Sequence, residues 1–267
     1  MIFIRMASQS VRSLNATGNT WHALLLREAL GRLLHRRAAW AWLLLEPAFH
    51  IGFMVFVFTA VRVRSIGGID TVVWLVLGFL GFFLFRRTAN QCSNAINANR
   101  TLFAYRQVKP VDTVIVRALV EGLLMLSVTV VILAAVGLCG HSVMPVRPLA
   151  VIEAAAGLWL LGLGFGLVVS VAKELVDELG NLIDMLMTPL YLMSGVILPL
   201  SSVPLPFREW LMYNPVAHGL EALRLGFAGY YHAAPELSLP YLHGCALVLL
   251  FFGLALHVRF QQRLVSQ

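Results

Sequence analysis

Ionisable side chains are few in this sequence, and several fall inside strongly apolar segments. The set consists of Glu46, His50, Arg117, Glu121, Glu153, Asp184, His243 and His257. Because an isolated charge in an apolar medium is costly, we expect these side chains to face a protein interior, an interface or a membrane surface. Arg117 and Glu121, four residues apart, are expected to form an ion pair; a proton relay is disfavoured because the acids do not recur through one layer. Glu153 and His257 lie near segment ends and are expected at the surface.

Motifs for catalysis, nucleotide binding and metal binding are absent from the sequence. A P-loop needs a Gly-Lys-Ser/Thr run, yet neither Lys109 nor Lys173 follows a glycine. The histidines form no HExxH-type pair, no GxSxG elbow occurs, and Cys92, Cys139 and Cys245 have no metal-like spacing. The sequence therefore predicts no catalytic residue, no metal and no cofactor in this chain. Any ATP hydrolysis would belong to another chain.

The composition indicates an integral membrane protein. Hydrophobic residues make up 59% of the 267 residues and charged residues 12%, whereas a soluble domain carries about 25% charged residues. The apolar runs are about 18 to 24 residues long, and about 20 helical residues cross a hydrocarbon core of about 30 Å. They lack the period-two alternation of barrel strands, so helices are predicted. We predict an all-α fold with six spans: residues 40–61, 71–85 (or on toward residue 94), 114–138, 149–172, 181–199 and 241–258.

The segment before the first span is predicted to be an amphipathic interfacial helix. Residues 1–39 form the expected cytoplasmic N-terminal region, and residues 40–267 form the transmembrane domain. From Trp21 to Arg37, leucines gather on one face and charged residues on another, which is typical of a helix lying in the membrane surface. Residues 1–20 show no apolar stretch before a small-residue cleavage site, so the first span is expected to be its own insertion signal.

The net charge is +7, and the positions of the basic residues along the sequence indicate the membrane topology. Placing both termini in the cytoplasm puts most lysines and arginines on that side, as the positive-inside rule requires. The basic residues left on the opposite side are Arg62, Arg64, Arg147, Arg208 and Arg224. This distribution favours contact with anionic lipid and argues against a nucleic-acid partner.

Residues 200–231 are predicted to form a re-entrant segment before the last span. Prolines interrupt them too often for one crossing helix, yet they are too apolar for a free loop. A pair of half-helices, surrounded by protein or lining a cavity, fits both facts. Pro215, Glu221 and Arg224 are predicted to form an outer gate, with the two charged residues paired at three-residue spacing. The alternative is a static ion pair that only holds the hairpin together.

Two segments of the sequence resemble a known family. The first is INANRTLFAYRQVKPVDTVIVRALVE, residues 96–121, and the second is LMSGVILPLSSVPLPFREWLMYNPVAHGLEALRLGF, residues 192–227. Together they resemble the permease subunits of ABC type-2 exporters. The FAYRQVKPVD run more narrowly resembles KpsM-type capsular polysaccharide export permeases, and the similarity extends over essentially the whole chain.

This resemblance implies a homodimer in the bacterial inner membrane, paired with two copies of a separate cytoplasmic ATPase that binds ATP and Mg. It implies export of a lipid-linked, usually anionic, capsular polysaccharide, which periplasmic and outer-membrane export proteins carry onward. No internal repeat is visible, so a symmetric pore needs a second copy. Gly162 and Gly166, four residues apart, indicate close helix packing within the subunit or at a dimer seam.

Alternative functions stay open at this point. The second segment is shared across type-2 exporters, so the cargo could be another glycopolymer, such as O-antigen or teichoic acid, or a small molecule. A membrane-embedded enzyme acting on lipid-linked sugars and a structural or assembly protein are further alternatives. A neighbouring ATPase gene would favour the transporter, whereas turnover of a lipid substrate without an ATPase would favour the enzyme.

A permease without its own ATPase needs a cytoplasmic element that docks on the partner, and residues 97–110 offer one. Aromatic and arginine side chains most often dominate interface energetics, and this stretch contains both. Pro110 ends the element and turns the chain toward the next span. The alternative is an amphipathic loop on lipid headgroups. The residues expected to contact the ATPase are Arg100, Leu102, Phe103, Tyr105 and Arg106.

The first span carries a stripe of aromatic side chains that we expect to line the translocation path. Its members are Trp42, Glu46, Phe49, Phe53 and Phe56. They follow one another at intervals of four, three, four and three, so they share one helical face. An acid on this face indicates protein or water rather than lipid. Aromatic faces suit sugar rings, and many weak stacking contacts would let a polymer slide; the alternative is ordinary helix packing.

Overall fold

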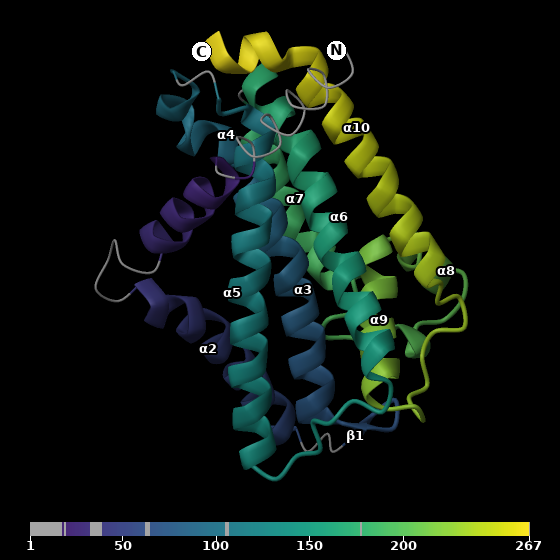
Figure 1. Ribbon diagram of the computed structural model, residues 1–267. Coiled ribbons are helices and arrows are strands. Elements are labelled where there is room, and N and C mark those ends of the chain that lie inside the picture. The colour runs from purple at the N-terminus through teal and green to yellow at the C-terminus, as the bar shows by residue number, and fades with distance from the viewer. Residues whose placement is uncertain are drawn as a thin grey trace, which may run out of the picture.

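Long helices that are apolar enough to span a membrane dominate the structure (Figure 1). The computed structural model describes residues 18, 20–32, 39–61, 65–104, 107–176 and 178–266. Within these ranges, five helices have the length and hydropathy of a span: α2 (Ala39–Ala60), α3 (Thr71–Ser93), α5 (Pro110–Leu138), α6 (Pro148–Leu175) and α10 (Leu239–Ser266). The expectation of an all-α membrane protein is therefore confirmed in its main features.

The expected span over residues 181–199 is the one that the helices do not reproduce. Here α7 (Leu179–Met193) has 15 residues, which correspond to about 22 Å and fall short of a hydrocarbon core of about 30 Å. The helix ends just before Gly195, whose φ of +75° lies in the left-handed region that glycine adopts readily at a helix C-terminus. A total of six spans therefore stays a prediction.

Short elements join the long helices. The antiparallel strands β1 (Ser65–Ile66) and β2 (Ile69–Asp70) form a hairpin whose turn residues, Gly67 and Gly68, have positive φ, as a two-residue turn requires. The remaining elements are α4 (Ala95–Ala98), η1 (Arg100–Ala104), η2 (Leu200–Ser202), α8 (Phe207–Leu211) and α9 (Pro215–Phe227). The hairpin lies at the opposite end of the bundle from α4 and the C-terminal end of α10 (Figure 1).

The central helix of the bundle is α3. Its side chains Trp74, Phe79 and Phe82 have no exposed surface, and the helix packs against α5, α6 and α9. The approach of α6 depends on glycine, because a Cβ at Gly162 would lie only 2.8 Å from the carbonyl oxygen of Phe85. The close packing expected from this glycine therefore occurs within the subunit.

The residues predicted to be re-entrant fold as η2, α8 and α9 rather than as one helix. Pro215 occupies the first position of α9, where its missing N–H costs little. Asn214 caps the helix, since its side chain accepts a hydrogen bond of 3.0 Å from the N–H of Val216. The broken helical course agrees with the sequence, and a re-entrant path stays a prediction.

A buried ion pair lies at the centre of α9. Glu221 and Arg224 are 3.2 Å apart and neither side chain is exposed, so the predicted pair is confirmed, whereas its role as a gate stays a prediction. Arg224 also donates to the carbonyl oxygens of Gly195 (2.9 Å) and Val196 (3.1 Å), directly after α7. Its guanidinium lies 3.6 Å from the ring centroid of Trp74 on α3. One side chain thus ties together α9, α3 and the segment after α7.

The carboxylate of Glu221 is satisfied on its other sides. It accepts hydrogen bonds from the Tyr231 hydroxyl (2.9 Å) and from the N–H of Ala234 (3.1 Å). Such complete pairing is what a fully buried charge needs, because each unmet hydrogen bond of a buried polar group is costly.

The expected surface position of His257 is wrong. The side chain is buried, and its Nε2 lies 3.1 Å from Ser170 Oγ on α6. The cause is the extensive packing of α10 along α6, which covers a position that looks terminal from hydropathy alone. Glu153 is exposed, as expected.

Replacing Arg224 by glutamine should destabilise the protein by about 3–5 kcal/mol, because Glu221 would keep its charge in a buried site without its cationic partner. Arg208 provides a matched control, since its pair with Glu236 (2.8 Å) is partly exposed. Arg208→Gln should cost less than about 1 kcal/mol. Thermal unfolding of the purified variants measures both effects, and similar losses at the two sites would contradict this assignment.

Candidate functional site

A polar cavity of about 460 Å³ lies where the N-terminal helix, residues 20–32, meets α2, α3 and α5. Charged side chains from all four elements line it, and we call it the charged cavity. Its lining consists of Glu28, Gly31, Arg32, Trp42, Leu43, Glu46, Arg87, Gln91, Arg117 and Leu124.

The N-terminal helix turns its polar side toward the bundle. Trp21 Nε1 donates to Asp112 Oδ1 on α5 (3.0 Å), and Arg27 donates to Asn99 Oδ1 near η1 (3.1 Å). Leu26 and Leu30 on the other side are about half exposed. The helix thus has one side held by protein and one leucine side left open, and its position at a membrane surface stays a prediction. The predicted continuation of this helix through residues 33–37 lies outside the described residues.

Glu121 is the acid at the centre of the charged cavity's ion pairs. Its side chain is completely buried, and it accepts hydrogen bonds from Arg32 of the N-terminal helix and from Arg87 Nε of α3 (2.7 Å). Arg87 reaches onward to Glu46 of α2 at 3.3 Å. Because a buried carboxylate needs paired charge, Glu121 holds the N-terminal helix against α3 and α5.

The expected pair between Arg117 and Glu121 is wrong. Arg117 Nε instead donates to Glu28 of the N-terminal helix (2.7 Å), and its Nη1 donates to the carbonyl oxygen of Asn94 (3.1 Å). The two residues share a face of α5, but each finds a partner with better geometry on another element. Burial alone would raise the pKa of the Glu28 carboxyl, but Arg117 and Arg32 outweigh it and hold the pKa below the usual value.

The charged side chains around this cavity are largely paired with one another. Its lining has three arginines and two glutamates, and the buried Glu121 beside it balances the charge. Most of the arginine donors already serve protein acceptors. Among the described residues, no group of three histidine, cysteine, aspartate or glutamate side chains could hold a metal ion. The sequence could not reveal this cluster as a unit, because Glu28, Arg32 and Arg87 come from distant segments. The signal available was that Glu28 is the one acid in a basic stretch.

The aromatic stripe of α2 faces away from the rest of the chain. Phe49, Phe53 and Phe56 are between 54% and 77% exposed, whereas the opposite side of α2 packs onto the core through residues such as Ile51. The structure therefore brings the stripe together on one open face, and its end at Trp42 and Glu46 forms part of the lining of the charged cavity.

The predicted ATPase-coupling residues divide between surface and core. Arg100 is partly exposed and donates to Glu174 Oε2 of α6 (2.7 Å), and Leu102 is half-buried. Phe103 is buried in a cluster with residues of α5, α6 and α10. Its side chain therefore packs η1 against these helices and is not on the surface. Tyr105 and Arg106 lie outside the described residues.

These features define a class of protein: a multi-pass helical membrane protein in whose sequence no nucleotide-binding motif occurs. The model of the ABC-2 type transporter family matches residues 19–228, and the chain belongs to this family.

The chain is also similar to several individual proteins. The chain is 34% identical to the polysialic acid transport protein KpsM of Escherichia coli over 238 residues, which are 89% of this chain and 92% of that protein. It is 29% identical to the capsule polysaccharide export inner-membrane protein CtrC of Neisseria meningitidis serogroup A over 249 residues, 92% of each chain. It is 24% identical to the capsule polysaccharide export inner-membrane protein BexB of Haemophilus influenzae over 256 residues, 96% of each chain. The resemblance found in the sequence is therefore confirmed.

Replacing Arg32 by glutamine should loosen the N-terminal helix, because Arg32 bonds Glu28, Gln91 and buried Glu121 at once. Hydrogen–deuterium exchange of residues 20–32 should then quicken at least several-fold. Arg27→Gln, which removes a single hydrogen bond to Asn99, is the control and should have a smaller effect. Unchanged exchange in Arg32→Gln would show that the ion pairs do not hold the helix.

Proposed function

We propose that this chain is the permease subunit of an ATP-driven exporter that moves lipid-linked capsular polysaccharide across the bacterial inner membrane. The observation that carries the proposal is its similarity, over most of its length, to three proteins named for polysialic acid transport or capsule polysaccharide export. The family match supports the transport class. The sequence supplies no catalytic motif, which supports a transport subunit rather than an enzyme acting on lipid-linked sugars.

The proposed assembly is a homodimer with two copies of a separate cytoplasmic ATPase that binds ATP and Mg. Periplasmic and outer-membrane export proteins would receive the polymer. Residues 1–39 would be cytoplasmic with an interfacial helix, and residues 40–267 would form a six-span domain with both termini inside. In this arrangement α7 belongs to the fifth span, and residues 200–231 form the re-entrant segment that carries Pro215, Glu221 and Arg224 as the outer gate.

The proposed path for the polymer runs along the open face of α2. The charged cavity adjoins the end of this face at Trp42 and Glu46. Its three arginines therefore lie beside the proposed path, each paired with a glutamate of the chain in this structure. Phe49, Phe53 and Phe56 continue the face and would stack on sugar rings as the polymer passes. Because the lone chain leaves these rings exposed, a second copy facing them across the dimer would enclose a path.

Export in inverted membrane vesicles tests both the function and this path. With the ATPase subunit and lipid-linked capsular polymer supplied, ATP should move polymer into the vesicle lumen, where an added glycanase cannot reach it. Phe49→Ala and Phe53→Ala should lower this protection several-fold, because the stripe loses its stacking surfaces. Leu44→Ala is the control, since Leu44 packs against the core on another side of the same helix.

The vesicle results separate the alternatives. No ATP-dependent protection of capsular polymer in the wild type would reject the proposed cargo, and protection of a different glycopolymer would replace it. Equal losses at all three positions, or losses explained by lower protein level, would mean that the stripe only packs.

Charge reversal at Arg100 tests the proposed coupling element. Arg100→Glu should weaken association with the ATPase several-fold by placing an acid where an acidic partner group is expected. The same change breaks the internal pair with Glu174, so Arg100→Glu with Glu174→Arg serves as the control that restores this pair in reverse. Co-purification and export should stay low in the double variant. Full recovery there would show that Arg100 acts only within the permease.

A further inference from the structure

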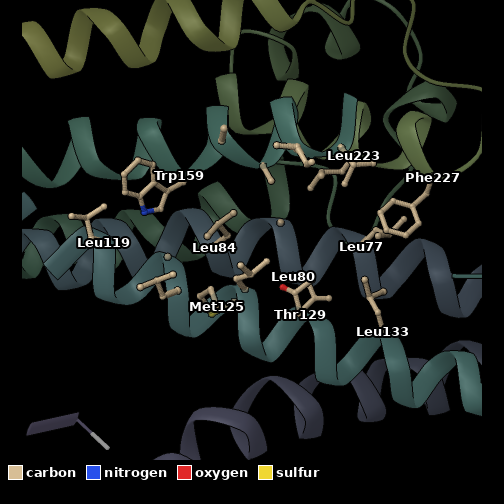
Figure 2. A pocket seen from close by; sticks show the side chains of 18 residues that line it. Leu77, Leu80, Leu84, Leu119, Met125, Thr129, Leu133, Trp159, Leu223 and Phe227 are labelled. Atoms are coloured by element: carbon tan, nitrogen blue, oxygen red, sulfur yellow. The ribbon is translucent and has the colours of Figure 1, made fainter. Parts of the chain in front are cut away.

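An apolar groove of about 460 Å³ runs between α3, α5 and α6, on the far side of α5 from the charged cavity. Figure 2 shows Leu119 and Trp159 at one end and Leu133 and Phe227 at the other. Polar side-chain groups in its lining are the hydroxyl of Thr129 and the indole N–H of Trp159, and this N–H already donates to the carbonyl oxygen of Ala118 (2.9 Å). A molecule bound in the groove would therefore make almost exclusively apolar contacts.

Two glycines, Gly81 and Gly122, and two alanines contribute to the lining of this groove. Trp159 lies against Gly122 so closely that a Cβ there would be 2.8 Å from the indole nitrogen. The short side chains of Ala155 and Ala156 on α6 leave space beside Trp159. Leu223 and Phe227 of α9 form part of the wall toward the end where Leu77 and Leu133 lie (Figure 2).

The groove opens toward the outside of the helix bundle. Three of its walls are candidate spans, and its lining residues Leu123, Leu126 and Ile152 are between 60% and 64% exposed. From Leu119 to Leu133 the rise along α5 is about 21 Å, which exceeds the hydrocarbon depth of one leaflet, about 15 Å of a core of about 30 Å. With these helices in a bilayer, the medium at this opening would be lipid.

We propose that this groove is a binding site for one acyl chain of a glycerophospholipid. Arg147 lies next to the groove's end, because its backbone N–H donates to the carbonyl oxygen of Gly226 (2.9 Å), beside Phe227 of the lining. Its side chain is exposed, and no ion pair found within the described residues includes it. A phosphate at the level of Arg147 would place the start of its acyl chain at Phe227 and Val151. An exposed guanidinium at this end of the groove can form charge-assisted hydrogen bonds with a lipid phosphate.

Lipid bound in this groove would contact α9 directly. Leu223 and Phe227 contact the groove, and Arg224 between them ties α9 to α3 and to the segment after α7. A bound acyl chain would therefore stabilise the position of the proposed outer gate. The site itself depends on the membrane assignment and not on the identity of the exported polymer.

Photolabelling tests the site directly. The purified full-length protein is reconstituted in vesicles of phosphatidylethanolamine and phosphatidylglycerol with a trace of phospholipid that carries a diazirine in one acyl chain, and labelled residues are mapped by mass spectrometry. Leu126 and Ile152 should be labelled several-fold more than the exposed, non-groove face of α5 around Ala134. Ala156→Phe should lower groove labelling about fivefold by filling the space, and Ala134→Phe should leave it unchanged.

Three results would overturn the proposal. Equal labelling of the groove and of the Ala134 face would show ordinary contact with bulk lipid. Unchanged labelling in folded Ala156→Phe, or in Ala156→Leu if the larger variant unfolds, would show that no chain enters the groove. Protection of Leu126 and Ile152 together with a protein crosslink across two copies would make the groove a subunit contact. Arg147→Gln should halve groove labelling at least, and no change would remove the phosphate contact from the proposal.

Discussion

Buried charge is the constraint on which the rest of this structure depends. Glu121, Glu221 and Arg224 have no exposed surface, and an unpaired charge in such a place would be strongly destabilising. Each of these side chains therefore forms hydrogen bonds or ion pairs with groups of other elements, and these interactions fix the positions of the helices. Arg224 brings α9 and the end of α7 onto α3, while Glu121 brings the N-terminal helix onto α3 and α5.

Local rules predicted the fold where partners are near in the chain. Hydropathy located five of the helices, and three-residue spacing located the Glu221–Arg224 pair. Both side chains lie on one short helix, and no ion pair found within the described residues joins either of them to another charged side chain. The same reasoning failed for Arg117 and Glu121, since Glu28, Arg32 and Arg87 arrive from other segments and offer better geometry. Hydropathy also extended the helix at residues 181–199 beyond Gly195, whose left-handed backbone ends it.

The family could be recognised from the sequence while the charged cavity could not. Recognition depends on contiguous runs, such as residues 96–121 and 192–227, that survive as linear patterns. The cavity depends on single residues of four elements, and no spacing rule joins Glu28 to Arg87. The aromatic stripe falls between these cases: periodicity predicted one shared face of α2, and the structure leaves that face uncovered in a single chain.

The burial of Phe103 has a mechanical consequence. Its ring packs among residues of α5, α6 and α10, including Leu264 near the end of the chain. Close-packed interiors have low compressibility and transmit strain. A displacement of η1 would therefore reach α5, α6 and α10 at once, and the part of the domain around η1 would move as one unit. The last turn of α10, which contributes Leu264 to this cluster, would take part in that movement.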